Sequence, residues 1–305
     1  MSTSSAAHQD SRAWIITGPT SGIGYRTALE LAKYGAVVLV GRDAAKLAGV
    51  QQEIESTGGA AVRVVADLSD LDSVRRAAST IVDLALPIGG LLNNAGVMPL
   101  RPFTTAQGWD GAFGTNHLGP LALTDALVPH LPDGANVVFI CSAVEDPERK
   151  IAVQAGFRGG RYISAEAAAR GEYLPGGSSR AAFDAYATSK QGNLAAVFSL
   201  ARELPRLHFR GIEPGVNPGS NLGRDAGAVV LALSKALSPA LALMPHYTTP
   251  RRAARVITRI LTDPSTASGV YYDENGKPMQ ASAQVSDPAF SDRYIAESRA
   301  LLAAA

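Results

Sequence analysis

The stretch AWIITGPTSGIG, residues 13–24, sets how the rest of the chain is interpreted. Residues 13–17 form a short apolar run of the kind found in strands that are buried on both faces. Glycines follow at Gly18, Gly22 and Gly24, and a helical pattern continues from there to Tyr34. The stretch therefore predicts a strand, a tight glycine turn and a helix, in that order.

A glycine turn in this place favours a bound phosphate group. Glycine lets the backbone approach a pyrophosphate closely, and the start of the helix adds free N–H groups and the positive end of its dipole. The spacing differs from G-x-G-x-x-G, since three residues separate Gly18 from Gly22, and an ordinary tight turn is the alternative interpretation. The residues expected to hold a dinucleotide here are Gly18, Thr20, Ser21, Gly22, Ile23 and Gly24.

After this turn, apolar runs and helical patterns alternate along the chain. Apolar runs lie at residues 36–40, 61–66, 90–93 and 136–141, and helical patterns lie at 44–56, 71–84 and around 118–128. In the second half, helices are expected at 183–203, 226–243 and 250–261, and strands at 207–212 and 269–272. Such alternation predicts βαβ units with right-handed crossovers. The expected fold class is α/β: a doubly wound parallel sheet in three layers, a Rossmann fold, forming a single domain over residues 12–305.

Composition restricts the classes of function. The 305 residues are 46% hydrophobic, which is enough for one large core, and the net charge of +1 without a basic run gives no footprint for nucleic acid. Cys141 is the single cysteine, so no internal disulfide forms, and we expect a reducing compartment, the cytoplasm. The five histidines are scattered without the spacing of a metal site, so no metal is expected.

Two segments lack the features of targeting or membrane sequences. Residues 1–11 are small and polar and are expected to be a disordered tail. Residues 226–244 are apolar, but Lys235 and Pro239 interrupt them. A membrane-spanning helix needs about 20 predominantly apolar residues. We therefore expect a buried or lid helix there and no membrane span.

The end of the second expected strand distinguishes the two nicotinamide cofactors. Sites for NAD place a carboxylate at this point, where it binds the ribose 2′-hydroxyl. This chain has Gly41 followed by Arg42. A guanidinium can pair with a 2′-phosphate and stack on adenine. We expect NADP(H) rather than NAD(H); the alternative is that Arg42 only solvates a loop and the cofactor site is indifferent to the phosphate.

Three side chains predict proton-transfer chemistry. Tyr186 and Lys190 are four residues apart in a helical stretch and so share a face. A neighbouring ammonium lowers the pKa of a phenol, whose ordinary value is about 10, and suits it to act as a general acid or base. Ser142 follows the run 136–141, where a parallel strand ends and ligands bind. The alternatives are an ordinary helix pair for the first two and a capping role for Ser142.

Taken together, the motifs resemble those of the short-chain dehydrogenase/reductase family, in its single-domain branch. NNAGVM at 93–98, NHLG at 116–119 and SGVY at 268–271 are most similar to retinol dehydrogenases and protochlorophyllide reductases. The segments that carry the resemblance span nearly the whole chain: they are 17–24, Asp67-Leu68, 93–96, Asn116, Ser142, the YATSK run 186–190 and Pro214-Gly215.

The resemblance implies roles for individual residues. Asn116, Ser142, Tyr186 and Lys190 would form the catalytic set, with Tyr186 and Lys190 also contacting the cofactor. Asn116 would bend a helix and hold a water that links the lysine to solvent; the alternative is a helix kink with no chemical role. Cys141, where relatives often carry a second serine, is interpreted as a packing residue.

The remaining implied roles concern the cofactor. Asp67 and the backbone of Leu68 would contact the adenine amino group, although Asp67 could instead be a helix N-cap. The other expected contacts are Asn94, Ala95 and Gly96 along the cofactor channel, Pro214 and Gly215 at the nicotinamide, and Ser220 at its carboxamide.

Two segments should shape the substrate site. Residues 143–183 form an insertion between Ser142 and Tyr186 that is longer than in most short members of the family. We expect it to form part of the substrate-entry wall; the alternative is a surface excursion that widens an oligomer contact. Residues 220–248 would be a mobile lid, whose apolar character favours a medium-to-large hydrophobic substrate. The family suggests a homodimer or homotetramer formed through the helices near Asn116 and Tyr186.

The resulting hypothesis is an NADP(H)-dependent oxidoreductase that interconverts a carbonyl and an alcohol. A catalytically inactive NADP(H)-binding sensor or scaffold of the same fold is the alternative, disfavoured because all four expected catalytic residues are present. A sugar-nucleotide epimerase would need another glycine spacing and a larger C-terminal region.

Overall fold

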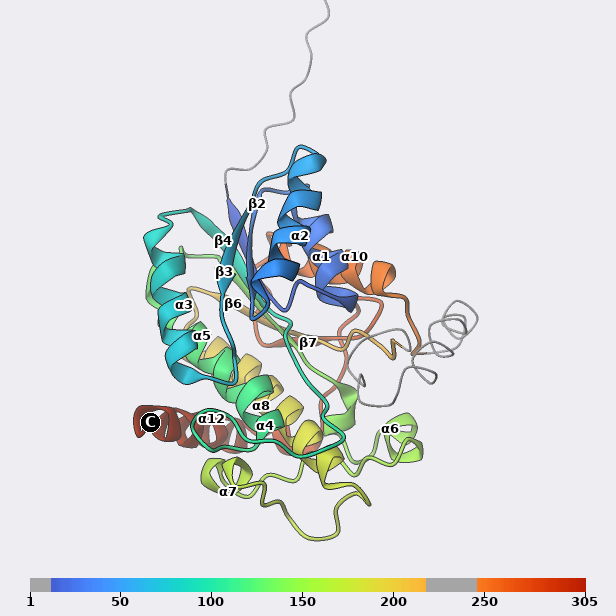
Figure 1. Cartoon of the computed structure of the whole chain (residues 1–305). Helices are drawn as coiled ribbons and strands as arrows, with labels where there is room; N and C mark the ends of the chain where they lie inside the picture. Colours follow the sequence, from blue (N-terminus) through green and yellow to red (C-terminus); the bar gives the residue numbers. More distant parts are fainter. Residues whose placement is uncertain (1–11, 218–245) are drawn as a thin grey trace, which may run out of the picture.

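A seven-stranded parallel sheet forms the centre of the molecule in this computed structural model, which describes residues 12–217 and 246–305 (Figure 1). The strand order is β3-β2-β1-β4-β5-β6-β7. Every pair of neighbours runs parallel. The order reverses between β1 and β4, which creates a crevice at the carboxyl ends of the strands. The strand bounds are β1 Ala13–Thr17, β2 Ala36–Gly41, β3 Ala61–Val65, β4 Ile88–Asn93, β5 Asn136–Ile140, β6 His208–Ile212 and β7 Val270–Tyr272.

Helices cover both faces of this sheet and produce three layers (Figure 1). One face packs against α1 (Gly22–Leu31), α2 (Ala44–Ser56) and α10 (Pro250–Leu261). The other packs against α3 (Leu71–Asp83), α5 (Gly119–Leu127) and α8 (Ala181–Glu203). Because apolar side chains meet helices on both sides, β1, β4 and β5 are buried at every position. The predicted α/β fold of one doubly wound domain is confirmed.

The element bounds differ from the sequence expectations in a few places. The expected strand 90–93 begins two residues earlier at Ile88, and the first helix ends at Leu31 instead of Tyr34. The helix expected around 118–128 corresponds to α5, which is preceded by two segments that were not predicted, α4 (Gly111–Phe113) and a π-helical turn (Gly114–Leu118). The expected helix 226–243 and the tail 1–11 lie outside the described residues.

The C-terminal helix α12 (Pro288–Ala303) was not predicted from the sequence, nor was the short α11 (Ala283–Ser286). Asp287 caps α12 by accepting from Ala289 N, and Pro288 occupies its first turn. This Asp-Pro pair is a helix-start signal that the sequence does carry. In the folded chain α12 lies along α8, where Tyr294 Oη donates to Thr188 O at 2.8 Å.

Helix α12 also covers the helix face through which we expected oligomers to form. Arg299 pairs with Asp125 of α5 and Glu203 of α8, with 2.7 Å contacts to both. His117 Nε2 and Ser298 Oγ are 2.9 Å apart in the buried interface. A dimer through α8 would therefore require displacement of α12. A homodimer or homotetramer stays a prediction, and it would have to use another surface.

The insertion 143–183 contains regular structure where the sequence showed no periodicity. It includes α6 (Lys150–Gln154) and α7 (Ala165–Ala169). The ring of Tyr162 stacks on Tyr294 with centroids 3.6 Å apart, and its hydroxyl donates to Glu297 Oε2 at 2.7 Å. Because both partners belong to α12, the insertion packs against the chain's own C-terminal helix.

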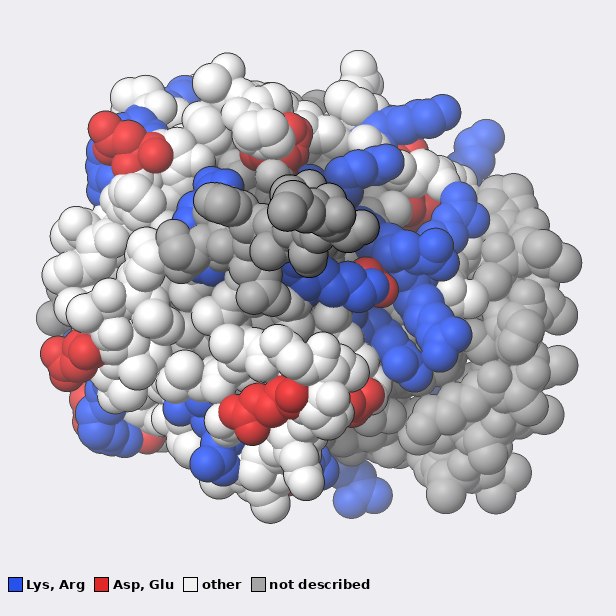
Figure 2. All heavy atoms as spheres, turned by 90° about the horizontal axis from the view of Figure 1, so that it is seen from above, with Lys and Arg blue, Asp and Glu red and all other residues white. Residues whose placement is uncertain are grey.

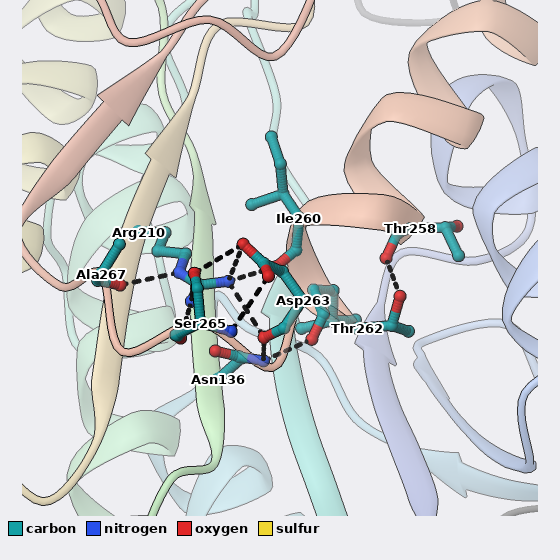
Figure 3. Close-up of polar contacts among 9 residues, drawn as sticks. Asn136, Arg210, Thr258, Ile260, Thr262, Asp263, Ser265 and Ala267 are labelled. Atoms are coloured by element: carbon teal, nitrogen blue, oxygen red, sulfur yellow. Dashed lines mark hydrogen bonds and ion pairs between the residues drawn. The ribbon is translucent and has the colours of Figure 1, made fainter.

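A buried arginine organises the connection between α10 and β7 (Figure 3). Arg210, in the middle of β6, is fully buried and donates from Nη1 to Ile260 O at 2.7 Å and from Nε to Ala267 O at 2.9 Å. Asn136 Nδ2 donates to Leu261 O at 2.8 Å. The last carbonyl groups of a helix have no partner within that helix, so these donors satisfy them and fix the end of α10 against β5 and β6.

Positive charge gathers on one part of the surface. Figure 2, a view from the top of Figure 1, shows Lys and Arg concentrated on the side where α10 lies. This helix exposes Arg251, Arg252, Arg255 and Arg259. The chain as a whole has a net charge of only +1, so the asymmetry is local. Within residues 12–217 and 246–305, no helix is long and apolar enough to cross a membrane.

The attachment of the insertion to the C-terminal segment generates a stability prediction. Glu145 is fully buried, and its carboxylate accepts from Ser282 N at 2.9 Å and Ser282 Oγ at 2.6 Å. Burial raises the pKa of Glu145 from its ordinary 4.5 to about 7. The folded protein therefore holds this proton more tightly than the unfolded chain does. The resulting contribution to the free energy of unfolding is complete below about pH 4.5. This contribution is lost as the pH rises to about 7 and amounts to on the order of 3 kcal/mol.

Glu145→Gln should remove that pH dependence. Denaturant unfolding of wild type and variant between pH 5 and 8.5 should show the variant gaining stability relative to wild type as the pH rises. Two curves of free energy against pH that run parallel across this range would show that Glu145 does not titrate as its burial implies.

Candidate active site

A cleft of about 750 Å³ lies at the carboxyl ends of the strands. It is lined by the described residues that were predicted to bind a dinucleotide, together with Ser142. Asn116 does not line the cleft, and Ser220 falls outside the described residues. The predicted residues that line the cleft are Gly18, Thr20, Ser21, Gly22, Ile23, Gly24, Arg42, Asp67, Leu68, Asn94, Ala95, Gly96, Ser142, Tyr186, Lys190, Pro214 and Gly215.

The glycine turn after β1 is fixed to the end of β4. Gly18 and Gly22 have φ of +68° and +57°, a region that L residues with side chains rarely adopt. Asn94 Nδ2 donates to Thr17 O at 2.9 Å, while Thr17 Oγ1 accepts from the backbone N of Asn94 and of Ala95 at 3.0 Å each. The side chain of Ser21 makes no capping bond, so the first N–H groups of α1 remain available to an anion.

The end of β2 places two cations in the cleft. Arg42 is exposed and lines it, and Lys46 on the first turn of α2 lines it as well. Asp43 is occupied as the N-cap of α2, accepting from Lys46 N at 3.0 Å, and its other oxygen pairs with Lys46 Nζ at 3.0 Å. Lys46 was not recognised in the sequence, although its place one helical turn after Arg42 could have indicated it.

Asp67 lies at the end of β3 on the cleft wall. Its Oδ1 accepts from Ser69 N at 2.9 Å and from Ser69 Oγ at 2.7 Å. The N-cap of α3 is Asp70, which accepts from Asp72 N. The alternative interpretation of Asp67 as that N-cap is therefore wrong, while its contact with adenine stays a prediction.

The structure brings Ser142, Tyr186 and Lys190 together at the opposite end of the cleft. Tyr186 and Lys190 are buried on α8, and Lys190 Nζ lies 5.6 Å from the centroid of the tyrosine ring. The ammonium donates to Ile140 O, the last residue of β5, at 2.8 Å. Ser142 lies just beyond that strand, and its side chain is close enough to Tyr186 to lower the pKa of the phenol. One helix and one strand end thus position the three groups.

The electrostatics of this group differ from the sequence expectation. Burial raises the pKa of Tyr186 well above 10, and the nearby carboxylate of Glu213 raises it further. Burial also lowers the pKa of Lys190 to about 8. The expectation that Lys190 lowers the pKa of Tyr186 is wrong for this arrangement. The reason is that the ammonium lies over the ring and donates to Ile140, so the loss of hydration of Tyr186 dominates.

Asn116 lies in the π-helical turn and holds the segment after β4. Its Oδ1 accepts from Val97 N at 2.7 Å, and its Nδ2 donates to Val97 O at 2.8 Å and Ser189 Oγ at 3.0 Å. A Cβ built on Gly96 would lie 3.4 Å from Asn116 Oδ1 and 3.7 Å from Lys190 Nζ. Asn116 therefore lies near Lys190 where the helix is irregular; its water-holding role stays a prediction.

Glu213 is a site residue that the sequence analysis missed. It directly follows β6, lines the cleft, and accepts at Oε1 from Gly215 N at 3.1 Å. Its Oε2 accepts from Ala143 N, and the neighbouring Ser142 side chain lowers the pKa of this carboxyl group. The signal was present, because an acid stands at the carboxyl end of a buried strand, directly before Pro214-Gly215.

The insertion contributes an apolar wall beside the tyrosine. Phe157 lines the cleft, stacks on Phe183 with centroids 4.3 Å apart, and lies 6.3 Å from the Tyr186 ring. Val144 and Met98 pack against this cluster and also line the cleft. Cys141 is buried and burial raises the pKa of its thiol to about 12, so it behaves as a packing residue. In the part of the chain that the structure describes, no three His, Cys, Asp or Glu side chains form a metal site.

Comparisons with known proteins agree with this geometry. The family model described as short chain dehydrogenase matches residues 12–154. Human retinol dehydrogenase 13 is 38% identical over 124 residues, which are 40% of this chain and 38% of that protein. A Streptomyces protein (strain C5) provisionally named daunorubicin C-13 ketoreductase DnrU is 33% identical over 210 residues, 67% of this chain and 65% of its own. The chain thus covers less than two thirds of these relatives.

Solved structures extend the likeness to nearly the whole chain. An uncharacterized protein from Mycobacterium paratuberculosis superposes with a TM-score of 0.70 at 25% identity, covering 96% of this chain and 93% of its own. A blue fluorescent protein from a metagenomic library, in complex with NADPH, has a TM-score of 0.65 at 23% identity, covering 88% and 97%. With its fold, its cleft and these relatives, the chain belongs to the short-chain dehydrogenase/reductase family, and within it resembles the retinol dehydrogenases.

Proposed function

We propose that the protein is an NADP(H)-dependent oxidoreductase that interconverts a carbonyl and an alcohol on a medium-to-large hydrophobic substrate. The observation that carries the proposal is the meeting of Ser142, Tyr186 and Lys190 at one end of a cleft whose other end holds a glycine turn and two cations. Relatives named as retinol dehydrogenases and as a ketoreductase act, by those names, on the same pair of functional groups.

The residues of the cleft fit a dinucleotide with a 2′-phosphate. The N–H groups that begin α1 suit the pyrophosphate. Arg42 and Lys46 both line the cleft at the end of β2, where they can contact a phosphate. The carboxylate beside them, Asp43, is already paired with Lys46. When bound, the cofactor supplies or accepts the hydride, and the protein provides binding, orientation and electrostatics.

Proton transfer falls to the tyrosine. Its raised pKa keeps the Tyr186 hydroxyl protonated at neutral pH, the state that a general acid needs for carbonyl reduction. Ser142, beside it, can hold the substrate oxygen by a hydrogen bond. The buried ammonium of Lys190 adds positive charge near the oxygen as negative charge develops there.

Tyr186→Phe should lower kcat for NADPH-dependent reduction by about 10²- to 10⁴-fold, because the proton donor is lost. Binding of NADPH, followed by its fluorescence, should persist. Tyr25→Phe is the matched control, since its surface hydroxyl bonds Glu53 and not the cleft. Binding of NADPH by wild type without turnover across a broad panel of ketones and quinones would favour the sensor or scaffold instead.

Arg42→Asp should weaken NADPH binding about tenfold to a hundredfold through loss of a charge-assisted contact and added repulsion. The affinity for NADH should change much less. Arg75→Asp on α3 is the control, because Arg75 pairs with Asp72 away from the cleft. Equal affinities for NADPH and NADH both before and after the Arg42 change would remove the cofactor assignment.

Phe157→Ala should raise KM about three- to tenfold for bulky apolar ketones, because the aromatic wall beside Tyr186 is lost. Small ketones that do not reach the wall should be affected little, and Phe157→Leu should keep most of the affinity. Steady-state kinetics on a size series of ketones measures this. An equal rise for small and large substrates would argue against a substrate wall in the insertion.

A further inference from the structure

Ser189 is a fully buried residue of α8 that the proposed chemistry does not use. It directly precedes Lys190 and follows Tyr186 by three residues. Its hydroxyl donates to Tyr186 O, one helical turn earlier, at 2.7 Å. A serine hydroxyl has a single proton, so towards any further partner the oxygen of Ser189 can only accept.

That further partner is Asn116, in the π-helical turn between α4 and α5. Asn116 Nδ2 donates to Ser189 Oγ at 3.0 Å and to Val97 O at 2.8 Å, while its Oδ1 accepts from Val97 N at 2.7 Å. Both protons of the amide and its oxygen are therefore engaged in a fully buried place. A rotated amide would set its NH₂ group against Val97 N and its oxygen against Val97 O, so these partners fix its orientation.

The chain of hydrogen bonds that begins at α8 ends in the wall of the cleft. Val97 lines the cleft next to Gly96. Because β4 ends at Asn93, Val97 lies beyond the strand ladder, and its N–H and C=O bond to the side chain of Asn116. A Cβ built on Gly96 would lie 3.7 Å from Lys190 Nζ, so a shift of this wall changes the space beside the lysine.

We propose that Ser189 is a positioning residue: acting through Asn116, it fixes the cleft wall at Val97 relative to the helical turn that carries Tyr186 and Lys190. Without the hydroxyl, one N–H of Asn116 has no acceptor in a fully buried place, which is unfavourable, so the amide turns and releases Val97. This inference rests on the proposed carbonyl chemistry, whose rate depends on the placement of the reacting groups.

The first test is the rate of ketone reduction in a single turnover at saturating NADPH and ketone. Ser189→Ala should lower this rate about three- to tenfold through loss of one hydrogen bond. The Kd for NADPH should stay close to that of wild type, since the glycine turn and Arg42 lie at the other end of the cleft. A rate in Ser189→Ala equal to that of wild type would overturn the proposal.

Ser199→Ala is the matched control. Ser199 is also buried on α8, but its hydroxyl bonds to Asp292 Oδ1 of α12 at 2.7 Å. The control should reduce ketone at the wild-type rate. An equal loss of rate in Ser189→Ala and Ser199→Ala would point to general loosening of α8 and would also count against a specific role of Ser189.

A double-mutant cycle shows whether Ser189 acts through Asn116. Asn116→Ala alone should lower the single-turnover rate at least as much as Ser189→Ala does. Adding Ser189→Ala to Asn116→Ala should then change the rate little, because the link is already absent. Losses that multiply in full in the double variant would mean that Ser189 acts independently of Asn116, contrary to the proposal.

The last test needs no turnover. Backbone hydrogen exchange followed by NMR should show the Val97 N–H exchanging about tenfold faster in Ser189→Ala than in wild type. The Ala95 N–H, which Thr17 Oγ1 accepts at 3.0 Å, should keep its rate, and Ser199→Ala should change neither amide. An unchanged Val97 rate would refute the link even in an active reductase. A faster Val97 rate in a protein that reduces no ketone would uphold the link and reject the proposed function.

Discussion

The hydrogen bonds between Thr17 and the segment after β4 hold the centre of the molecule in place. Thr17 Oγ1 accepts from two consecutive N–H groups, of Asn94 and Ala95, and Asn94 returns a bond to Thr17 O. They join the carboxyl ends of β1 and β4, where the strand order reverses. A Cβ at Gly24 would lie 2.3 Å from Gly18 O, so the turn and α1 tolerate no larger residue there. This junction therefore forms part of the cleft wall, which Gly18, Asn94 and Ala95 line.

The C-terminal part of the chain supports the end of the cleft that holds Tyr186 from outside the half of the chain that carries the glycine turn. Helix α12 covers α8, which carries Tyr186 and Lys190, and it also receives the insertion through Tyr162 and Glu297. Arg210 fixes the segment between α10 and β7 from the far end of the same sheet (Figure 3). Since a small displacement of reacting groups costs much of the rate, this packing has a functional consequence as well as a structural one.

Loss of hydration dominates the chemistry of the catalytic end. It raises the pKa of Tyr186 and of Glu213 and lowers that of Lys190 to about 8, so each pKa moves toward the neutral form while Lys190 stays mostly charged at pH 7. A neutral phenol is a proton donor, which agrees with carbonyl reduction.

The sequence by itself determined the sheet, its alternation with helices and most of the cleft. Apolar runs and turns depend on nearby residues, and the carboxyl ends of parallel strands meet at one edge, so the order of residues along the chain was enough to place Gly18, Arg42 and Ser142 on one cleft. Only the tertiary structure decided which groups face each other. The bond from Ala143 N to Glu213, the bond from Lys190 to Ile140 O and the cover of α12 on α8 join residues distant in the chain. Sequence periodicity carries no information about such contacts or about the hydration that they remove.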